Sequence, residues 1–214
     1  MRLILILTAL LAFQSATASE FDEMKALADQ GNANAQLNLG VMYDNGEGVP
    51  ENDAEAVKWY RKAADQGFAN AQYNLGVMYS GGYGVPENDA EAVKWYRKAA
   101  DQGFAKAQFN LGFMYDDGYG VPENNAEAVK WYRKAADQGD AIAQSNLGHM
   151  YLRGEGIPEN NIRAYVWWSM AKTQGHANAV TNIDILKPMM TPQQIADGQA
   201  LATKCYESNY KECN

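Results

Sequence analysis

The feature that most constrains this chain is a sequence period of 36 residues. The segment VPENDAEAVKWYRKAADQGFA occupies residues 49–69 and returns unchanged at residues 85–105. A third copy at 121–139 differs only by Asn125, and a fourth copy at 157–175 keeps its proline, tryptophan and glycine in register. Single residue types recur with the same period, as Gln36, Gln72, Gln108 and Gln144, as Gly40, Gly76, Gly112 and Gly148, and as Trp59, Trp95, Trp131 and Trp167. Such a period predicts one structural unit stacked several times.

Each period predicts two helices joined by a short loop. The first copy begins with Ala33–Asp44, where apolar residues recur at helical spacing. Glycines and a proline follow in residues 45–50, which predicts a loop that ends this helix. Asn52 or Asp53 is then placed to cap a second helix, and with Asn52 as the cap Glu55 could complete a capping box. Because one such hairpin cannot bury its own apolar face, neighbouring hairpins must stack.

The repeated residues resemble a known family. The pattern A-x-A-Q-x-N-L-G-x-M-Y-x-x-G-x-G-V-P-x-N, followed by A-x-x-W-Y-x-K-A-A-x-Q-G, is similar to the Sel-1-like repeat (SLR), a relative of the tetratricopeptide repeat. The resemblance covers roughly residues 21–182. It implies an all-α fold, a right-handed α/α superhelix or solenoid whose concave face is lined by the first helix of each pair. It also implies binding to other proteins, without indicating a partner or a reaction.

The two ends of the chain fit a capped array of about four repeats. We expect repeats at 33–68, 69–104, 105–140 and 141–176, and a partial one at 177–190, within a solenoid that covers residues 19–190. Phe21–Gly31 ends like a second helix and predicts an N-terminal half-repeat. Thr191, Pro192 and Gln194 predict the start of a C-terminal capping helix that runs to about Tyr206, within a final region of residues 191–214.

The first 18 residues have the pattern of a secretory signal peptide. Arg2 precedes an apolar stretch at residues 3–13, and Ala16 and Ala18 have the spacing that a signal peptidase recognises. The apolar stretch is too short to span a bilayer, which needs roughly 20 residues. An N-terminal anchor or a buried helix is the alternative. We therefore expect an exported protein, periplasmic or secreted, whose mature chain does not insert into a membrane.

Charge and cysteine content narrow the function further. The formal net charge is −8, which disfavours nucleic acid or an anionic membrane as the partner. Cys205 and Cys213 are the two cysteines, too few for a multi-cysteine zinc cluster. In an oxidising compartment they are expected to form a structural disulfide at the C-terminal end. We expect no cofactor and no metal site.

Positions that vary between the four copies point to a binding surface. On the first helix of each repeat, positions 34, 37, 41, 44 and 45 vary and share one arc, from about 280° to 20° on a helical wheel. Large aromatic side chains gather there and in the following loops, and such residues are common anchors of protein interfaces. The predicted partner-binding residues are Tyr73, Phe109, Phe113, Tyr83, Tyr119, Val77 and His149. Packing of these rings inside a closed superhelix is the alternative.

Catalysis has little support in the sequence. Ser169 and Lys172, and Ser208 and Lys211, have the Ser-x-x-Lys spacing of an acylating serine. No Lys-Thr-Gly and no Ser-Asp-Asn accompanies them, so we assign no catalytic residue. We expect an interaction scaffold or adaptor, monomeric rather than homo-oligomeric, that binds a protein or peptide. A weak hydrolase of β-lactams or peptidoglycan and a self-associating structural envelope protein are the alternatives.

Overall fold

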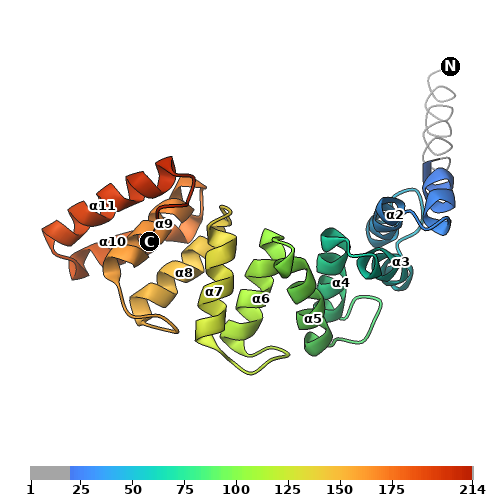
Figure 1. Ribbon diagram of the computed structural model, residues 1–214, viewed down its shortest axis with the longest axis horizontal. Helices are drawn as coiled ribbons and strands as arrows, with labels where there is room; N and C mark the ends of the chain where they lie inside the picture. Colours follow the sequence, from blue (N-terminus) through green and yellow to red (C-terminus); the bar gives the residue numbers. More distant parts are fainter. Residues whose placement is uncertain (1–19, 214) are drawn as a thin grey trace, which may run out of the picture. The chain divides into compact units, whose positions relative to one another are not determined.

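The computed structural model describes residues 20–213, so the expected signal peptide at residues 1–18 lies outside the described residues. Within residues 20–213 every regular element is helical, which confirms the all-α prediction. After a helix at residues 20–29, the elements are α2 (Ala33–Asn45), α3 (Asp53–Asp65), α4 (Ala69–Gly81), α5 (Asp89–Asp101), α6 (Ala105–Asp117), α7 (Asn125–Ala136), α8 (Ala141–Arg153), α9 (Asn161–Thr173), α10 (Ala177–Leu186), the short 3₁₀ helix η1 (Lys187–Met189) and α11 (Pro192–Glu207) (Figure 1). Consecutive pairs of these helices are the predicted hairpins.

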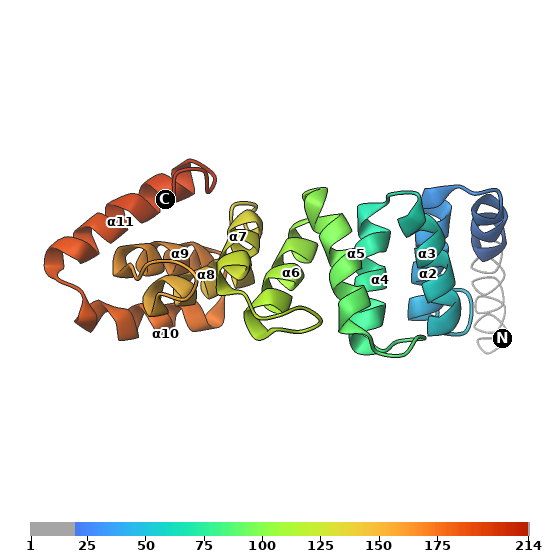
Figure 2. The ribbon, with the colours of Figure 1, turned by 60° about the horizontal axis from the view of Figure 1, so that its bottom comes forward.

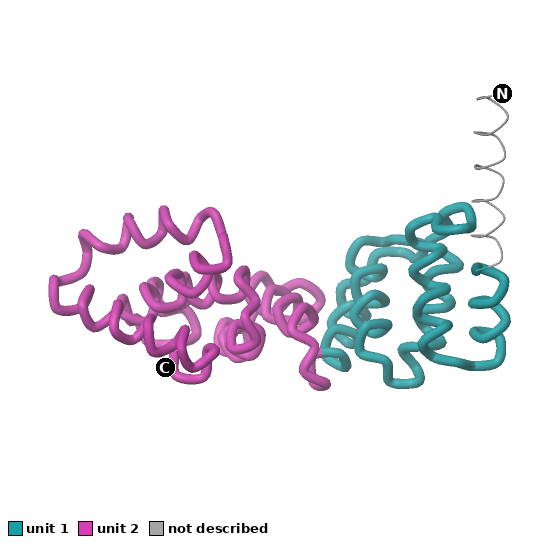
Figure 3. Tube along the Cα trace, turned by 90° about the horizontal axis from the view of Figure 1, so that it is seen from above, with its two compact units in different colours: residues 1–99 teal, residues 100–214 magenta. Residues whose placement is uncertain are grey.

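The chain divides into two compact units, Met1–Ala99 and Ala100–Asn214 (Figure 3). In the first unit, α3 packs against both α2 and α4. In the second unit, α7 likewise contacts α6 and α8, and α9 contacts α8 and α10. The second helix of a repeat therefore contacts its own first helix and the first helix of the next repeat.

An asparagine at the start of each second helix fixes the loop. The Asn52 side chain accepts a hydrogen bond from the Glu55 backbone N–H at 3.1 Å, which identifies Asn52 as the cap. The Asn52 backbone N–H donates to the Tyr43 carbonyl at 2.8 Å. Since that donor already has an acceptor, the Glu55 carboxylate does not complete a capping box and instead accepts from Lys58 Nζ at 2.5 Å. The same pair of Asn bonds recurs at Asn88, Asn124 and Asn160.

Invariant glycines allow the two helices of a hairpin to approach closely. A Cβ atom on Gly40 would lie 2.5 Å from the ring of Tyr60, and one on Gly112 would lie 2.7 Å from the ring of Tyr132. Both tyrosines are fully buried. Trp59, the neighbour of Tyr60 on α3, is also buried, but the ring that lies directly on the glycine is that of Tyr60.

Buried glutamines connect each repeat to the one before it. Gln36 Nε2 donates to the Ala28 carbonyl at 3.0 Å, and Gln144 Nε2 donates to the Ala136 carbonyl at 3.1 Å. Gln72 and Gln108 make the same bond. The glutamine oxygen is also used, because Gln174 Nε2 donates to Gln144 Oε1 at 2.7 Å. Each bond adds a second donor to a carbonyl in the last turn of a helix, which also accepts from the backbone N–H of the glycine three residues later.

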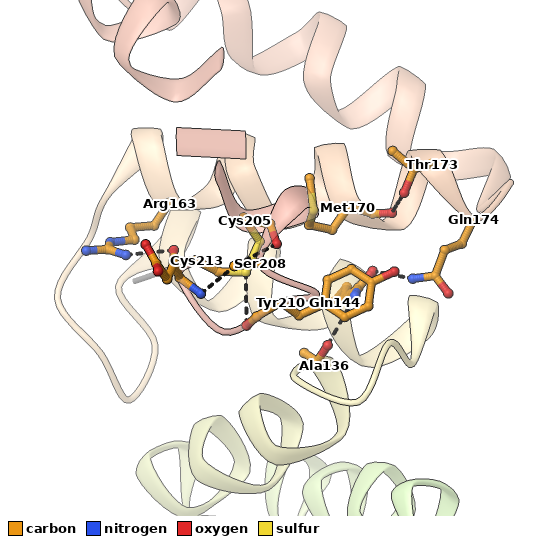
Figure 4. The surroundings of a disulfide bond; sticks show 11 residues. Ala136, Gln144, Arg163, Met170, Thr173, Gln174, Cys205, Ser208, Tyr210 and Cys213 are labelled. Carbon is orange, nitrogen blue, oxygen red and sulfur yellow. Dashed lines mark hydrogen bonds between the residues drawn. A yellow bond between two sulfur atoms is a disulfide. The ribbon is translucent and has the colours of Figure 1, made fainter. Parts of the chain in front are cut away.

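The last helix covers the end of the second unit. Figure 2 shows α11 alongside α9, and the two helices are in contact. Thr191 and Gln194 form the predicted capping box. Cys205 and Cys213 form a disulfide, and both residues are fully buried. The Arg163 guanidinium on α9 donates to the Cys213 carbonyl at 2.7 Å, so the C-terminal segment is held to the last full repeat (Figure 4).

Replacing Gln144 tests the connection between repeats. Gln144→Leu removes one of the two donors to the Ala136 carbonyl, which keeps the Gly139 backbone N–H, and it removes the acceptor of the exposed Gln174 side chain. We expect the free energy of unfolding in urea to fall by about 0.5–1.5 kcal/mol, the net value of a typical hydrogen bond. The control is Gln199→Leu, since Gln199 is exposed on α11, and it should change stability by less than about 0.5 kcal/mol. Equal effects of the two substitutions would contradict a role for the buried bonds.

Breaking the disulfide tests the attachment of the C-terminal segment. In the chain-entropy account, closing a loop of this length contributes about 2.5 kcal/mol. Urea unfolding of the oxidised chain, the fully reduced chain and the Cys205→Ala/Cys213→Ala variant measures this contribution. The reduced chain and the variant should both lose stability, and the variant should not respond to reductant. An oxidised chain that is no more stable than the reduced chain would contradict a stabilising role for the disulfide.

Candidate partner-binding surface

In the first unit, the predicted partner-binding residues differ in exposure. Tyr73 on α4 is half-buried, and its ring centroid lies 5.9 Å from that of Tyr96. Val77, one turn further along α4, is also half-buried. Tyr83, in the loop after α4, is 53% exposed. Tyr83 is therefore the residue of this group that presents the most side-chain surface to solvent.

In the second unit, two of the predicted aromatic residues form an exposed pair. The rings of Phe113 on α6 and Tyr119 in the following loop are stacked, with centroids 5.7 Å apart and planes 29° apart. They are 42% and 48% exposed, respectively, and we call them the aromatic pair. Phe109 is half-buried, packs against the core of this unit and lies 6.0 Å from the Tyr132 ring. Phe109 therefore contributes to packing as well as to the surface.

A hollow of about 200 Å³ adjoins the aromatic pair within the second unit. α6 and α8 form its walls, and Tyr132 on α7 lies between them. Its lining residues, which define what we call the acidic hollow, are Phe113, Asp116, Asp117, Tyr132, Asn146, His149, Met150, Arg153 and Glu155. Two of the predicted residues, Phe113 and His149, thus face the same space.

Asp116 is the carboxylate most affected by this environment. Tyr132 donates its hydroxyl to Asp116 Oδ2 at 3.1 Å. Burial raises the pKa of Asp116 above its usual range, and the carboxylates of Asp117, Glu155 and Glu123 add to the increase, while the Tyr132 bond opposes it. Burial also raises the pKa of Tyr132, so its hydroxyl remains a donor. The folded chain therefore holds negative charge here against a desolvation cost.

His149 closes one side of the acidic hollow. Its ring lies edge-on to Trp168, with centroids 5.1 Å apart, and its Nε2 is 3.2 Å from Asn182 Nδ2. Burial lowers the pKa of His149, and the nearby Arg153 lowers it further. The folded environment thus favours the neutral imidazole over the imidazolium.

Sequence reasoning identified the aromatic residues but not the hollow itself. Asn146 is invariant between the repeats, and the position of Tyr132 carries a tyrosine in three repeats and Trp168 in the fourth, so their pattern indicated packing alone. The sequence placed Asp116 and Asp117, with Arg153 as a basic exception, near the aromatic residues and favoured a basic and apolar partner, but it did not place these residues in one hollow. Their spacing from Phe113 and His149, three or four positions along a helix, was the available signal that they share a face.

Ser169 and Ser208, the serines of the two Ser-x-x-Lys patterns, donate their hydroxyls to backbone carbonyls. Ser169 Oγ donates to the Tyr165 carbonyl at 2.8 Å, within its own helix. Ser208 Oγ donates to the Cys205 carbonyl at 3.0 Å and accepts from the Glu212 backbone N–H at 2.9 Å. Each hydroxyl is thus engaged by local backbone rather than presented in a pocket, which gives no support to an acylating role.

Metal sites and membrane-spanning helices are two further features to consider in residues 20–213. No cluster of three or more histidine, cysteine or acidic side chains in this range could hold a metal ion. No helix of this range is both long and apolar enough to cross a membrane.

Comparison with known families identifies the repeats. The family model described as Sel1 repeat matches residues 33–68, 69–104, 105–140 and 141–176. The chain belongs to the Sel1 repeat family. Proteins of the Sel1 repeat family are generally scaffolds for protein–protein interaction and are generally not catalytic.

Solved structures of Sel1 repeat proteins agree with this assignment. One is a protective antigen of uropathogenic Escherichia coli that displays an SLR fold, with 35% identity and a TM-score of 0.81. The match covers 90% of this chain but 42% of that protein, so this chain spans less than half of the relative's length. A second is a Sel1 repeat protein from Oxalobacter formigenes, with 34% identity, a TM-score of 0.71 and coverage of 89% and 82% of the two chains. A search of curated proteins finds no match.

The titration of His149 gives a pH prediction for this Sel1 repeat protein. Because the folded state lowers the pKa of His149, the unfolded chain binds the proton more readily, and stability falls as the pH drops through the ordinary histidine pKa of about 6.5. His149→Gln removes this titration. The melting temperature of the variant should therefore fall less between pH 7.5 and pH 5.5 than that of the wild type. Scanning calorimetry at both pH values measures the difference. Identical pH profiles for the two proteins would contradict a lowered pKa of His149 in the folded state.

Proposed function

We propose that this chain is an exported, non-catalytic scaffold that binds another protein or peptide through the variable positions of its first helices and the loops that follow them. The family resemblance places these positions on the concave side of the array. Tyr83 in the first unit and the aromatic pair in the second provide the exposed contact surface.

The observation that carries the proposal is the exposed aromatic pair. Phe113 and Tyr119 stack on each other, which orders both rings before any partner arrives. Aromatic side chains with large exposed surface and restricted motion bind with a small entropy cost. Val41 and Glu47 occupy the corresponding positions of the first repeat, so the repeat fold does not require these rings. Their exposure is better explained by recognition than by packing.

The proposal of export rests on the N-terminal sequence and on the cysteines. The first 18 residues have the charge, apolar stretch and small residues of a signal peptide. The disulfide between Cys205 and Cys213 is of a kind that persists in the periplasm or outside the cell. We propose a mature chain that begins near Ser19 and consists of the solenoid followed by a disulfide-stabilised cap.

The other two functional classes have less support. A hydrolase of β-lactams or peptidoglycan would need an activated serine, and the hydroxyls of Ser169 and Ser208 are bonded to backbone groups. Self-association through stacked repeats would use the apolar end of the array, and α11 packs over α9 there. We therefore propose a monomeric binding protein.

Affinity capture with matched variants tests the proposed function. The bait is the mature chain, the test variant is Phe113→Ala/Tyr119→Ala, and the samples are envelope and secreted fractions analysed by mass spectrometry. The control is Tyr206→Ala, because Tyr206 is another exposed aromatic residue, 59% exposed on α11. We expect a partner that is retained by the wild type and the control and reduced at least tenfold by the test variant.

Circular dichroism should first show equal helical content and melting for all three proteins, so that lost binding is not lost folding. A partner retained equally by the test variant would place the binding surface elsewhere.

A further inference from the structure

We infer that the acidic hollow receives a guanidinium group, the side chain of an arginine in an extended segment of the partner, with the aromatic pair contacting the residues beside it. This inference rests on the proposed function and specifies the chemistry of the partner at one site.

The size of the hollow suits one long side chain. Its volume of about 200 Å³ is comparable with the roughly 150 Å³ of a protein cavity that holds a benzene molecule. A second hollow, about 320 Å³, adjoins it and shares Asp116, Asp117, Arg153 and Glu155 with it. Together they form a depression that an extended segment can follow while one side chain enters.

The charges that line both hollows favour a cation. Asp116, Asp117 and Glu155 line the first, and Glu123 adds a fourth carboxylate to the second. Arg153 is the one cationic residue that lines them, and it lies 3.7 Å from Glu155 with most of its side chain exposed. Because this ion pair is long and solvent-exposed, it neutralises little of the negative charge. A partner cation would also offset the burial that raises the pKa of Asp116.

A guanidinium matches the geometry better than an ammonium. Asp116 and Asp117 both line the hollow, and the planar fork of an arginine can donate to two carboxylate oxygens at once. Phe113 lines the same hollow, and an aromatic face attracts a guanidinium. This chain already uses such contacts internally, since the guanidinium carbon of Arg133 lies 5.9 Å from the Tyr151 ring centroid.

The first unit shows which of these residues the fold requires. Tyr60 donates to Asp44 at 2.9 Å just as Tyr132 donates to Asp116, so that bond is not specific to the acidic hollow. Two repeats before Asp117, Arg153 and Glu155, the chain carries Asn45, Gly81 and Tyr83. These three charges are therefore not needed to build a repeat, and they occur together where α6 and α8 meet.

A two-dimensional NMR titration with a defined peptide tests the inference. The probe is acetyl-Gly-Phe-Arg-Gly-amide, and the matched probe carries citrulline, which keeps the shape of arginine without its charge. The arginine probe should shift backbone resonances of residues 113–119 and 146–155, and the citrulline probe should bind at least tenfold more weakly. Shifts located elsewhere, or equal affinity for the two probes, would overturn the inference.

Charge variants complete the test. Asp117→Asn/Glu155→Gln changes two surface residues without removing the acceptor of Tyr132, and it should weaken binding of the arginine probe at least tenfold. Asp184→Asn/Glu207→Gln makes the same change in net charge on exposed residues of α10 and α11 and should leave the affinity unchanged. Equal loss in both variants would mean that the net charge of the chain, rather than this site, attracts the probe.

The capture experiment separates this inference from the proposed function. A partner that depends on the aromatic pair but is retained by Asp117→Asn/Glu155→Gln would overturn the guanidinium site and leave the scaffold role standing. A partner lost by both variants supports both proposals.

Discussion

The repeat array depends on a hydrogen bond from a buried glutamine to the end of the preceding helix. A helix leaves carbonyls without partners at its C-terminal end, and burying them uncompensated costs free energy. Gln36, Gln72, Gln108 and Gln144 each donate to a carbonyl in the last turn of the preceding helix, in addition to the glycine N–H that this carbonyl already accepts. This bond joins one hairpin to the hairpin before it. Further repeats can therefore be added to the array by forming the same bond again.

This arrangement separates the residues that hold the fold from those that are free to change. Gly112 and Tyr132 meet inside one hairpin, and their counterparts recur in every repeat as glycine with tyrosine or tryptophan. The opposite arc of the first helix carries no such constraint and differs from repeat to repeat. In the second unit, that arc brings Phe113, Asp117 and Arg153 to one surface. Specific recognition is thus possible on a scaffold built from nearly identical parts.

Much of the fold could be predicted from the sequence, because caps and periodicity act locally. Asn52 and Thr191 begin helices where their spacing indicates. The partial burial of Phe109 was harder to predict from the sequence, because it depends on Tyr132, which lies on another helix. The acidic hollow was missed for the same reason: its lining comes from α6, α7, α8 and the loop after α8, and no single stretch of sequence contains it.

The central claim is that the variable face of the second unit binds the partner while the invariant face maintains the fold. Hydrogen–deuterium exchange of the chain, alone and with its captured partner, tests this most directly. The account predicts added protection at residues 113–119 and 149–155, with little change in α9 and α11. Protection concentrated on α9 and α11, with residues 113–119 unaffected, would contradict it.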